Sequence, residues 1–497
     1  MVSALRTMIA WDVRLQVKYG FYTVYAVLTV TFILGLQVVG SGLRTDAAVL
    51  LIVTDPTILG FYFIASMVLF EKEEGVLDAL VTSPLGDRGY LASKVLTLSL
   101  LAVIASALVA VLGHGTTPRL GLLLVGVCLS ASLFALIGFV AVARYDSVNE
   151  YFISAVGWGT VLFLPLFGYV GLVETPLFYL LPAQPVLLLV EGGFRSPPAW
   201  QVAYGLGYLF VGNAIAYLWA RRTFRQHVVR GGDPGRQLGG GRVPGSWQQR
   251  GQSSFATRSP WAGLILADLR NWIRDPMLAI AAVGPFALAV VVRLGAPRVA
   301  ELAAPMFALE PHYPVIVGSM VAFGPAIYGF VVGMFVLEDR EQGVLAAYRV
   351  SPLSARGYLL YRGIAAYVLT LLAILPALVI IGRSQVPPAV LIGSAVVGAL
   401  SGPAIAFVFG TVASNTIEGI AISKLINLVI LGPAVGIVVI PEPLQFAIGV
   451  LPTYWPVKAV VSGIAGEALW PVFLLVGVVI HLMGLAVLSQ WFARRAD

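Results

Sequence analysis

The chain has 497 residues, of which 59% are hydrophobic and 11% are charged, and its formal net charge is +7. Soluble domains usually contain about 25% charged residues, so this composition excludes an ordinary soluble protein and predicts a polytopic membrane protein. The single cysteine, Cys128, cannot form a disulfide within the chain, so it indicates nothing about the redox compartment.

The first twenty residues do not have the pattern of a cleavable signal peptide. Charged residues interrupt the stretch where an apolar core would be required, namely Arg6, Asp12, Arg14 and Lys18. We expect a short leading helix in the cytoplasmic interface of the membrane, with an apolar stripe formed by Val2, Leu5, Ile9, Val13 and Val17. The motif AWDVR at residues 10–14 resembles LADLR at 266–270, which predicts a second leading helix.

Apolar runs of about 20 residues have the length of a membrane-spanning helix. In the first half they cover residues 21–40, 47–70, 95–112, 119–142, 152–172 and 202–220. In the second half they cover residues 276–293, 314–337, 363–382, 388–410, 419–440 and 471–491. We therefore expect an all-α polytopic membrane protein with about 12 transmembrane helices, as two tandem six-helix repeats with parallel topology. Continuous runs of this kind disfavour a β-barrel, whose strands alternate over about 10 residues.

A polar stretch between the second and third spans of the first half returns in the second half. Residues 71–94 read EKEEGVLDALVTSPLGDRGYLASK, and residues 339–362 read DREQGVLAAYRVSPLSARGYLLYR. We call these segments the first and the second repeated loop. At a constant shift of 268 positions, 11 of the 17 residues from 75 to 91 are identical. So many identities at one spacing indicate an internal duplication.

The repeated loops must lie outside the hydrocarbon, because each charge costs about 2.5–3.5 kcal/mol at the centre of a membrane helix. In the first loop the sequence predicts a break at Gly75, a short and partly apolar helix, and a stop at Ser83-Pro84. Such a helix on the cytoplasmic side is typical of a docking element. The alternative is an ordinary connection between two spans, but connections tolerate change, so two preserved copies favour docking.

Inside the spans, candidate functional residues are few. Asp55 falls within the second span, where a carboxylate marks a candidate substrate path; it equally fits the cap of a helix that restarts at Pro56. Glu150 and Glu418 stand just before the fifth span of each half, where we expect caps or contacts of a cytoplasmic gate. The four histidines are dispersed along the chain, so no metal site is expected.

The two halves are joined by an arginine-rich and glycine-rich segment. Residues 223–260 contain one acid, Asp233, and six arginines at positions 225, 230, 236, 242, 250 and 258. The positive-inside rule places this segment in the cytoplasm, and an even number of spans then places both termini there. Because topology explains the arginines, we expect no nucleic-acid partner. The predicted organisation is a six-span unit at 1–222, a flexible linker at 223–260 and a second six-span unit at 261–497.

The first repeated loop resembles a loop of a known protein family. The pattern Glu-x-Glu-x-Gly-x-Leu-x-x-Leu-x-x-Ser/Thr-Pro after the second span is similar to the first cytoplasmic loop of type-2 ATP-binding-cassette (ABC) permeases, which include many drug, polysaccharide and lipid exporters. The resemblance covers the leading helix, the six spans of each unit and a proline-containing hairpin region before span six. It departs from the family at Val76 and Val344, where threonine is usual, and at Ala346, which replaces the acid matching Asp78.

In that family the loop is a coupling helix, which sits in a groove of a separate ATPase subunit and transmits its closure to the spans. In the first repeated loop the resemblance implies this role for Glu71, Glu73, Gly75, Leu77, Leu80, Ser83 and Pro84. In the second it implies the role for Glu341, Gly343, Leu345, Ser351 and Pro352. We add the charged residues of the same loops, Glu74, Arg88 and Arg356, as candidates.

The resemblance also implies an energy source in another polypeptide. The chain contains no G-x-x-x-x-G-K-[ST] phosphate loop, so we expect no enzymatic activity and no bound cofactor, with ATP and Mg²⁺ held by two copies of a partner ABC ATPase. The expected location is the plasma membrane of a prokaryote. Apart from membrane lipid, the remaining partner is a small lipophilic substrate, because apolar walls with few charges favour an amphipathic drug or lipid.

Two alternatives belong to other classes. Twelve spans in two parallel halves is also the plan of ion- or proton-coupled major facilitator transporters, whose loop signature has the core Asp-Arg-x-Gly-Arg. In this chain Arg88 is followed by Gly89-Tyr90, and Ala355 replaces Asp87 in the second copy, so the match is poor. An intramembrane enzyme is disfavoured by the absence of an H-E-x-x-H motif or a close carboxylate cluster.

Overall fold

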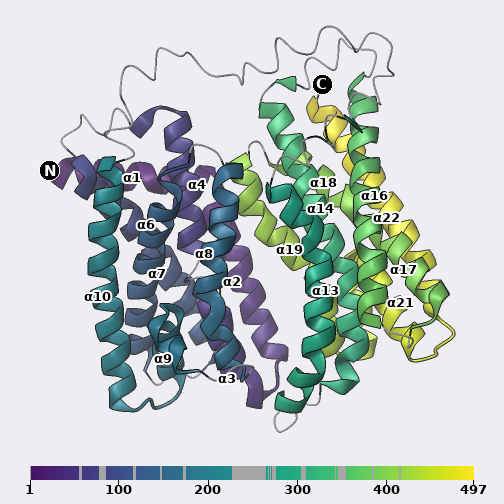
Figure 1. Cartoon of the computed structure of the whole chain (residues 1–497), viewed down its shortest axis with the longest axis horizontal. Helices are drawn as coiled ribbons and strands as arrows, with labels where there is room; N and C mark the ends of the chain where they lie inside the picture. Colours follow the sequence, from purple (N-terminus) through teal and green to yellow (C-terminus); the bar gives the residue numbers. More distant parts are fainter. Residues whose placement is uncertain are drawn as a thin grey trace. The chain divides into compact units, whose positions relative to one another are not determined.

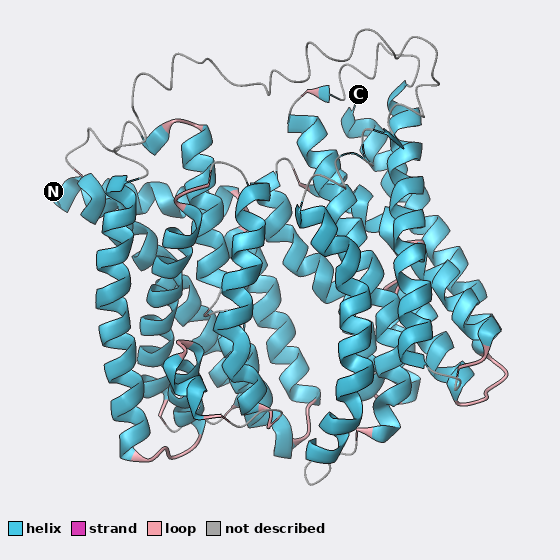
Figure 2. Ribbon diagram, in the orientation of Figure 1, coloured by secondary structure: helices cyan, strands magenta, loops and turns pink. Residues whose placement is uncertain are grey.

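The structure is a computed structural model. It describes residues 2–54, 57, 59–77, 85–115, 119–145, 148–171, 175–226, 265–266, 268, 270, 276–303, 309–341, 343–344, 354–382, 386–413 and 416–496. Every regular element among these residues is a helix (Figure 2). The chain divides into two compact units, Met1–Gly245 and Ser246–Asp497, which we call unit 1 and unit 2.

Unit 1 begins with a helix that is bent away from the next one. Helix α1 (Val2–Lys18) meets the following helix at an angle of 64°, and Gly20 between them has a left-handed backbone (φ 73°). The other helices of unit 1 are α2 (Phe21–Val38), α3 (Ser41–Thr54), α4 (Leu59–Glu73), α6 (Gly86–Leu108), η1 (Val109–His114), α7 (Leu120–Val142), α8 (Val148–Tyr169), η2 (Pro176–Leu180), α9 (Ala183–Phe194) and α10 (Ala199–Phe224).

Unit 2 has a corresponding succession of helices. They are α13 (Pro276–Ala303), η4 (Glu310–His312), α14 (Tyr313–Glu341), α16 (Ser354–Gly382), α17 (Pro388–Ala399), α18 (Ser401–Val412), α19 (Thr416–Val439), α20 (Glu442–Gln445), η6 (Phe446–Val450), α21 (Tyr454–Ile464) and α22 (Trp470–Ala496). In each unit short helices stand before the last long one, where the sequence predicts a proline-containing hairpin: η2 and α9 in unit 1, and α20, η6 and α21 in unit 2.

The helices confirm an all-α polytopic membrane protein. Each of the twelve predicted ranges contains helix; the second, third and tenth ranges are each occupied by two consecutive helices, α3 with α4, α6 with η1 and α17 with α18. Among the described residues, nine helices are long and apolar enough to cross a membrane, or ten if the bent pair α1 and α2 counts as one span. The count of twelve spans therefore stays a prediction.

One helix forms the centre of each unit. In unit 1, α7 packs against α4, α6, α9 and α10; in unit 2, α14 packs against α16, α18, α19 and α21. Close approach in unit 1 depends on Gly138 of α7, where a β-carbon would lie 2.5 Å from the carbonyl oxygen of Phe61 on α4. In unit 2 the glycine also stands on the central helix, since a β-carbon at Gly329 of α14 would lie 2.9 Å from the carbonyl oxygen of Gly402 on α18. Small residues at such contacts let membrane helices pack closely.

Helix α1 runs across the end of unit 1, beside α6 (Figure 1). Its buried face differs from the expected apolar stripe, of which Val17 is exposed and Leu5, Ile9 and Val13 are only half-buried. The buried residues of α1 are Met8, Asp12, Leu15 and Gln16. The inward face is therefore partly polar, and the Gln16 side-chain amide donates a hydrogen bond to the Thr97 hydroxyl of α6 (2.8 Å).

The predicted linker falls largely outside the described residues, which end at 226 and resume at 265. Residues 223 and 224 belong to α10. The predicted domain limits therefore stay predictions.

Candidate functional site

The two ends of the first repeated loop meet in a cluster of charged side chains, which we call the Lys94 cluster: Asp12, Glu71, Tyr90, Ser93 and Lys94. The Lys94 ammonium of α6 donates hydrogen bonds to Asp12 of α1 (Nζ to Oδ1, 2.6 Å) and to Glu71 of α4. The Tyr90 hydroxyl donates to Glu71 Oε2 (2.6 Å), and the Ser93 hydroxyl donates to Asp12. One cation thus joins three helices.

The Lys94 cluster is completely buried. Asp12, Glu71, Ser93, Lys94 and Tyr90 all have 0% exposed surface. Removing charges from water costs several kcal/mol per ion unless good partners replace the water, and here every charge has an opposite charge or a hydroxyl in contact. Within the residues that the structure describes, no three His, Cys, Asp or Glu side chains lie close enough to hold a metal ion. The cluster is therefore an ion-pair network.

Unit 2 contains the same arrangement built from other residues, which we call the Arg362 cluster: Asp268, Asp339, Tyr358, Tyr361 and Arg362. The Arg362 guanidinium of α16 donates through Nη1 to Asp268 Oδ2 (2.9 Å) and through Nη2 to Asp339 Oδ2 (2.7 Å). The Tyr358 hydroxyl donates to Asp339, and the Tyr361 hydroxyl donates to Asp268 (2.6 Å). Arg362 is 6% exposed.

The two clusters correspond position by position. The shift of 268 pairs Glu71 with Asp339, Tyr90 with Tyr358 and Lys94 with Arg362, and the similar leading motifs pair Asp12 with Asp268. In unit 2 the acid is the shorter aspartate, Asp339, and the cation is the longer arginine, Arg362. The ion pair is therefore preserved although both residue types differ from those of unit 1. The feature shared by the units is therefore the connection between an acid of the leading segment, the end of the second span and the start of the third.

Each repeated loop leaves its cluster through a glycine with a left-handed backbone. Gly75 has φ 65° and Gly343 has φ 71°, and no atom lies within 4 Å of where a β-carbon would stand at either position. The requirement for glycine is therefore conformational, because residues with a side chain rarely adopt positive φ. The sequence motif predicts a break at this position, and the helices end here as the motif predicts.

A second contact joins the end of the second span to the end of the fourth. In unit 1 the Lys72 ammonium donates to the carbonyl oxygens of Ala143 (2.7 Å) and Tyr145 (2.6 Å), just beyond the end of α7. In unit 2 the equivalent Arg340 donates to Ala413 and Gly410 at the end of α18 (3.3 and 3.4 Å). A cation at these carbonyls satisfies acceptors that a helix leaves free at its C-terminus and interacts favourably with the helix dipole.

Replacing Lys72 by methionine is expected to lower the stability of the purified protein by about 1 kcal/mol, because it removes the charge and the hydrogen bonds at the end of α7. The measurement is the thermal midpoint in detergent. Arg14→Met, which removes an exposed cation from α1, is the control and should leave the midpoint unchanged. Equal midpoints for the two variants would contradict a role for Lys72 at this helix end.

One contact distinguishes unit 1 from unit 2. Asp87, in the first turn of α6, accepts hydrogen bonds from Arg221 Nε (3.1 Å) and Arg225 Nε (2.9 Å) at the end of α10. The equivalent residue in the second repeated loop is Ala355, which has no carboxylate. The start of the third span is therefore linked by charge to the last span in unit 1, and the second repeat lacks the acid for such a link.

The predicted site residues differ in burial, and the structure does not describe all of them. Glu71 and Leu77 are buried, whereas Glu74, Gly75, Arg88, Glu341 and Gly343 are exposed. Glu418 is half-buried in the first turn of α19, and the side chains of Glu73, Glu150 and Arg356 are not described. Outside the described residues lie Asp55, Leu80, Ser83, Pro84, Leu345, Ser351 and Pro352.

Sequence reasoning missed most of the residues that fasten the loops. It assigned no function to Asp12, Tyr90 or Lys94, nor to their counterparts in unit 2. A signal existed, because the shift of 268 preserves a tyrosine at 90 and 358, an acid at 71 and 339, and a cation at 94 and 362. Comparing charge sign as well as identity between the two halves would have found them.

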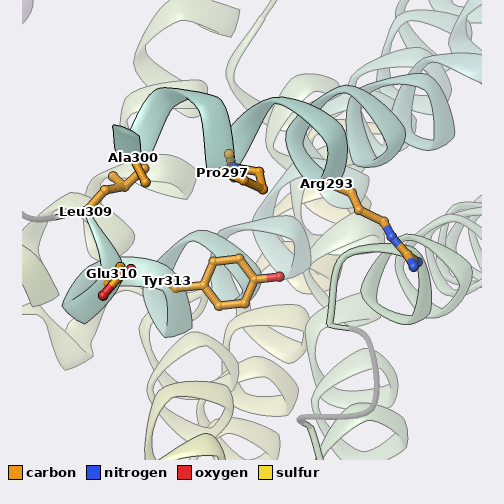
Figure 3. A pocket seen from close by; sticks show the side chains of 7 residues that line it. Arg293, Pro297, Ala300, Leu309, Glu310 and Tyr313 are labelled. Carbon is orange, nitrogen blue, oxygen red and sulfur yellow. The ribbon is translucent and has the colours of Figure 1, made fainter. Parts of the chain in front are cut away.

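Unit 2 also has a pocket of about 330 Å³ at the end opposite to the Arg362 cluster. In Figure 3, Arg293, Pro297 and Ala300 of α13 face Glu310 and Tyr313. The Arg293 guanidinium donates to the carbonyl oxygen of Ile380 (2.8 Å), and the Tyr313 hydroxyl donates to that of Ile381 (2.7 Å). Both polar groups thus bind the last turn of α16, so the pocket offers a ligand mainly an apolar wall and the exposed Glu310.

Two family models match the chain, one in each unit. The model of the fluoroquinolones export permease protein family matches residues 3–231, and the model described as fluoroquinolones export permease protein Rv2686c-like matches residues 268–489. No solved structure matches the chain.

Individual relatives come from Mycobacterium tuberculosis (strain ATCC 25618 / H37Rv). Fluoroquinolones export permease protein Rv2687c is 32% identical over 233 residues, which are 46% of this chain and 97% of the relative. Fluoroquinolones export permease protein Rv2686c is 29% identical over 248 residues, which are 49% of this chain and 98% of the relative. Each relative thus matches about half of this chain, and neither match supports the major facilitator alternative. The chain therefore belongs to the fluoroquinolones export permease family of ABC-type drug exporter permeases, with two permease units in tandem.

Proposed function

We propose that this chain forms the complete membrane path of an ATP-driven drug exporter. Two permease units in one chain supply both halves of the path, and two copies of a separate ABC ATPase dock on the two repeated loops. The substrate is a lipophilic or amphipathic drug, and the names of the relatives make a fluoroquinolone the first compound to test.

The observation that carries this proposal is the pair of equivalent clusters. In each unit the repeated loop contains a positive-φ glycine directly beyond a charged network that joins the two ends of the loop. A connection that only spans the distance between two helices would not require the same glycine and equivalent ion pairs in both copies. A loop that receives a push from a partner does require firmly held ends.

The ATP chemistry belongs to the partner in this proposal. The chain has no phosphate-loop motif, so ATP and Mg²⁺ bind to the ATPase subunits and the chain itself acts as a transport subunit. The repeated loops, both termini and the linker then lie in the cytoplasm, and the spans cross the plasma membrane of a prokaryote. The arginines of the linker support this orientation through the positive-inside rule.

The test is a detergent pull-down of the tagged chain from its native host, with bound proteins identified and ATP hydrolysis measured. The native chain should retain a phosphate-loop ATPase, and a Gly75→Pro/Gly343→Pro double variant should lose it. Proline fixes φ near −65°, so it cannot reproduce the backbone at these positions.

A matched control separates loop geometry from general instability. Gly171 and Gly466 also have positive φ (76° and 75°) and open space at the β-carbon, but they follow α8 and α21, at the opposite end of each unit. Gly171→Pro/Gly466→Pro should therefore keep the ATPase. Equal ATPase recovery from both double variants would contradict docking on the repeated loops. Transport driven by an ion gradient without any ATPase would instead support a secondary carrier.

A further inference from the structure

We infer that the Lys94 and Arg362 clusters are positioning devices that make the leading helix and the second and third spans of a unit move as one body when the ATPase pushes the repeated loop. This inference rests on the proposed function, because it requires a partner that moves the loop. It assigns a role to Asp12, Lys94 and Tyr90, and to their counterparts Asp268, Arg362 and Tyr358.

The first argument is the position of the cluster relative to the loop. Glu71 lies at the end of α4 and Lys94 in the third turn of α6, so their ion pair joins the two chain segments that enter and leave the first repeated loop. The backbone between them contains Gly75 and Gly86, both with positive φ (65° and 61°). A displacement of the loop can therefore bend the chain at the glycines, whereas the cluster resists separation of the two helices.

The second argument is that direct packing between α4 and α6 in unit 1 is limited. Both α4 and α6 pack more extensively against α7 than against each other. Without the Lys94 cluster, α4 and α6 would be connected mainly through α7. The cluster supplies the direct link, and Asp12 extends this link to α1.

The third argument concerns the chemistry chosen for the link. Buried ion triads are often no more stable than apolar residues of similar volume, because desolvation offsets the attraction between the charges. Packing alone therefore does not explain why both units retain an acid, a cation and an acid while the residue types change. Ion pairs fix direction and distance, whereas apolar surfaces can slide. A link that transmits movement between helices needs a fixed direction and a fixed distance.

The two units are not equally dependent on the link. In unit 2, α14 packs extensively against α16, so packing already couples the second and third spans there. In unit 1 the corresponding contact, between α4 and α6, is smaller. The ion pairs of Asp87 with Arg221 and Arg225 join α6 to α10 instead. We therefore expect loss of the Lys94 cluster to impair coupling more than loss of the Arg362 cluster.

The test uses the full chain with its copurifying ATPase in lipid vesicles. Fluoroquinolone transport and ATP hydrolysis are measured in the same sample, which gives the drug transported per ATP. The decisive variant replaces every polar group of the Lys94 cluster: Asp12→Leu, Glu71→Met, Tyr90→Phe, Ser93→Ala and Lys94→Met. All five side chains have 0% exposed surface, so they cannot contact the ATPase. The variant should therefore keep the ATPase bound and hydrolysing, while drug transported per ATP falls at least about ten-fold.

Conservative exchange is the matched control. Lys94→Arg gives unit 1 the cation of unit 2, and Arg362→Lys does the reverse, so both should keep the transport ratio within about two-fold. If the five-residue variant fails to fold, Asp268→Asn/Asp339→Asn/Arg362→Met applies the same test in unit 2, where the two acids are 22% exposed. Its transport ratio should fall by at least about two-fold.

The outcomes separate the two proposals. A native chain without any ATPase would overturn the proposed function and, with it, this inference. A folded variant without its cluster that retains the ATPase and transports as much drug per ATP as the native chain would overturn the inference alone. Loss of the ATPase from such a variant would also overturn the inference, because the cluster would then serve docking instead of transmission.

Discussion

Replacing Lys94 by alanine is expected to destabilise the protein by about 3–5 kcal/mol, the usual cost of removing one partner of a buried ion pair. The substitution leaves the carboxylates of Asp12 and Glu71 in a site with 0% exposure and without their cation. Two like charges then remain close together in a medium that screens them poorly. The measurement is the thermal midpoint, together with the yield of monodisperse protein in detergent.

The control for this variant stands on the same helix. Arg88 of α6 is exposed, so Arg88→Ala should change the stability by no more than about 0.5 kcal/mol. A Lys94→Ala midpoint equal to that of Arg88→Ala would mean that water reaches the two carboxylates, and the buried network described above would then be wrong. Unlike the coupling test, this experiment needs no ATPase partner.

The second large effect is expected at the contact between α4 and α7. Gly138→Leu should prevent the folding of unit 1, because a β-carbon at this position would lie 2.5 Å from the carbonyl oxygen and 2.9 Å from the Cα of Phe61. Overpacking commonly costs about 1–3 kcal/mol, and more when the structure cannot adjust. Here the obstacle is backbone, so the cost should exceed about 3 kcal/mol and be seen as loss of monodisperse protein.

Gly121 provides the control within the same helix. It lies on an exposed part of α7 with no atom within 4 Å of a β-carbon, so Gly121→Leu should be recovered at the native level. In unit 2, Gly329→Leu should behave like Gly138→Leu, because its β-carbon would lie 2.7 Å from that of Ile405. Normal recovery of either buried variant would show that the helices can separate without loss of the fold.

Much of the architecture follows from the sequence because it depends on local properties. Long apolar runs define the helices, and each of the twelve predicted ranges contains helix in the structure. The shift of 268 between the halves identified both repeated loops and the shared glycines within them, Gly75 and Gly343, where the backbone has positive φ. These features can be predicted because hydrophobicity and glycine conformation act within a few residues.

The packing of α1 was not predictable in the same way. The apolar pattern suggested a face with Val13 and Val17, but the buried face includes the charged Asp12 and the polar Gln16. Hydrophobic periodicity assigns a charged residue to the exterior, and this rule fails when a cation from a distant helix neutralises it. The partner of Asp12 is Lys94, 82 residues away, and no local pattern connects the two.

The sequence by itself thus determined the fold class, the duplication and the position of the two loops, because these depend on composition, periodicity and repetition. Only the tertiary structure decided that Asp12, Glu71 and Lys94 form one buried network, and that Asp268, Asp339 and Arg362 repeat it. The physical reason is that an ion pair depends on three-dimensional proximity. Charges far apart in the chain become partners only when helix packing brings them together and removes the water between them.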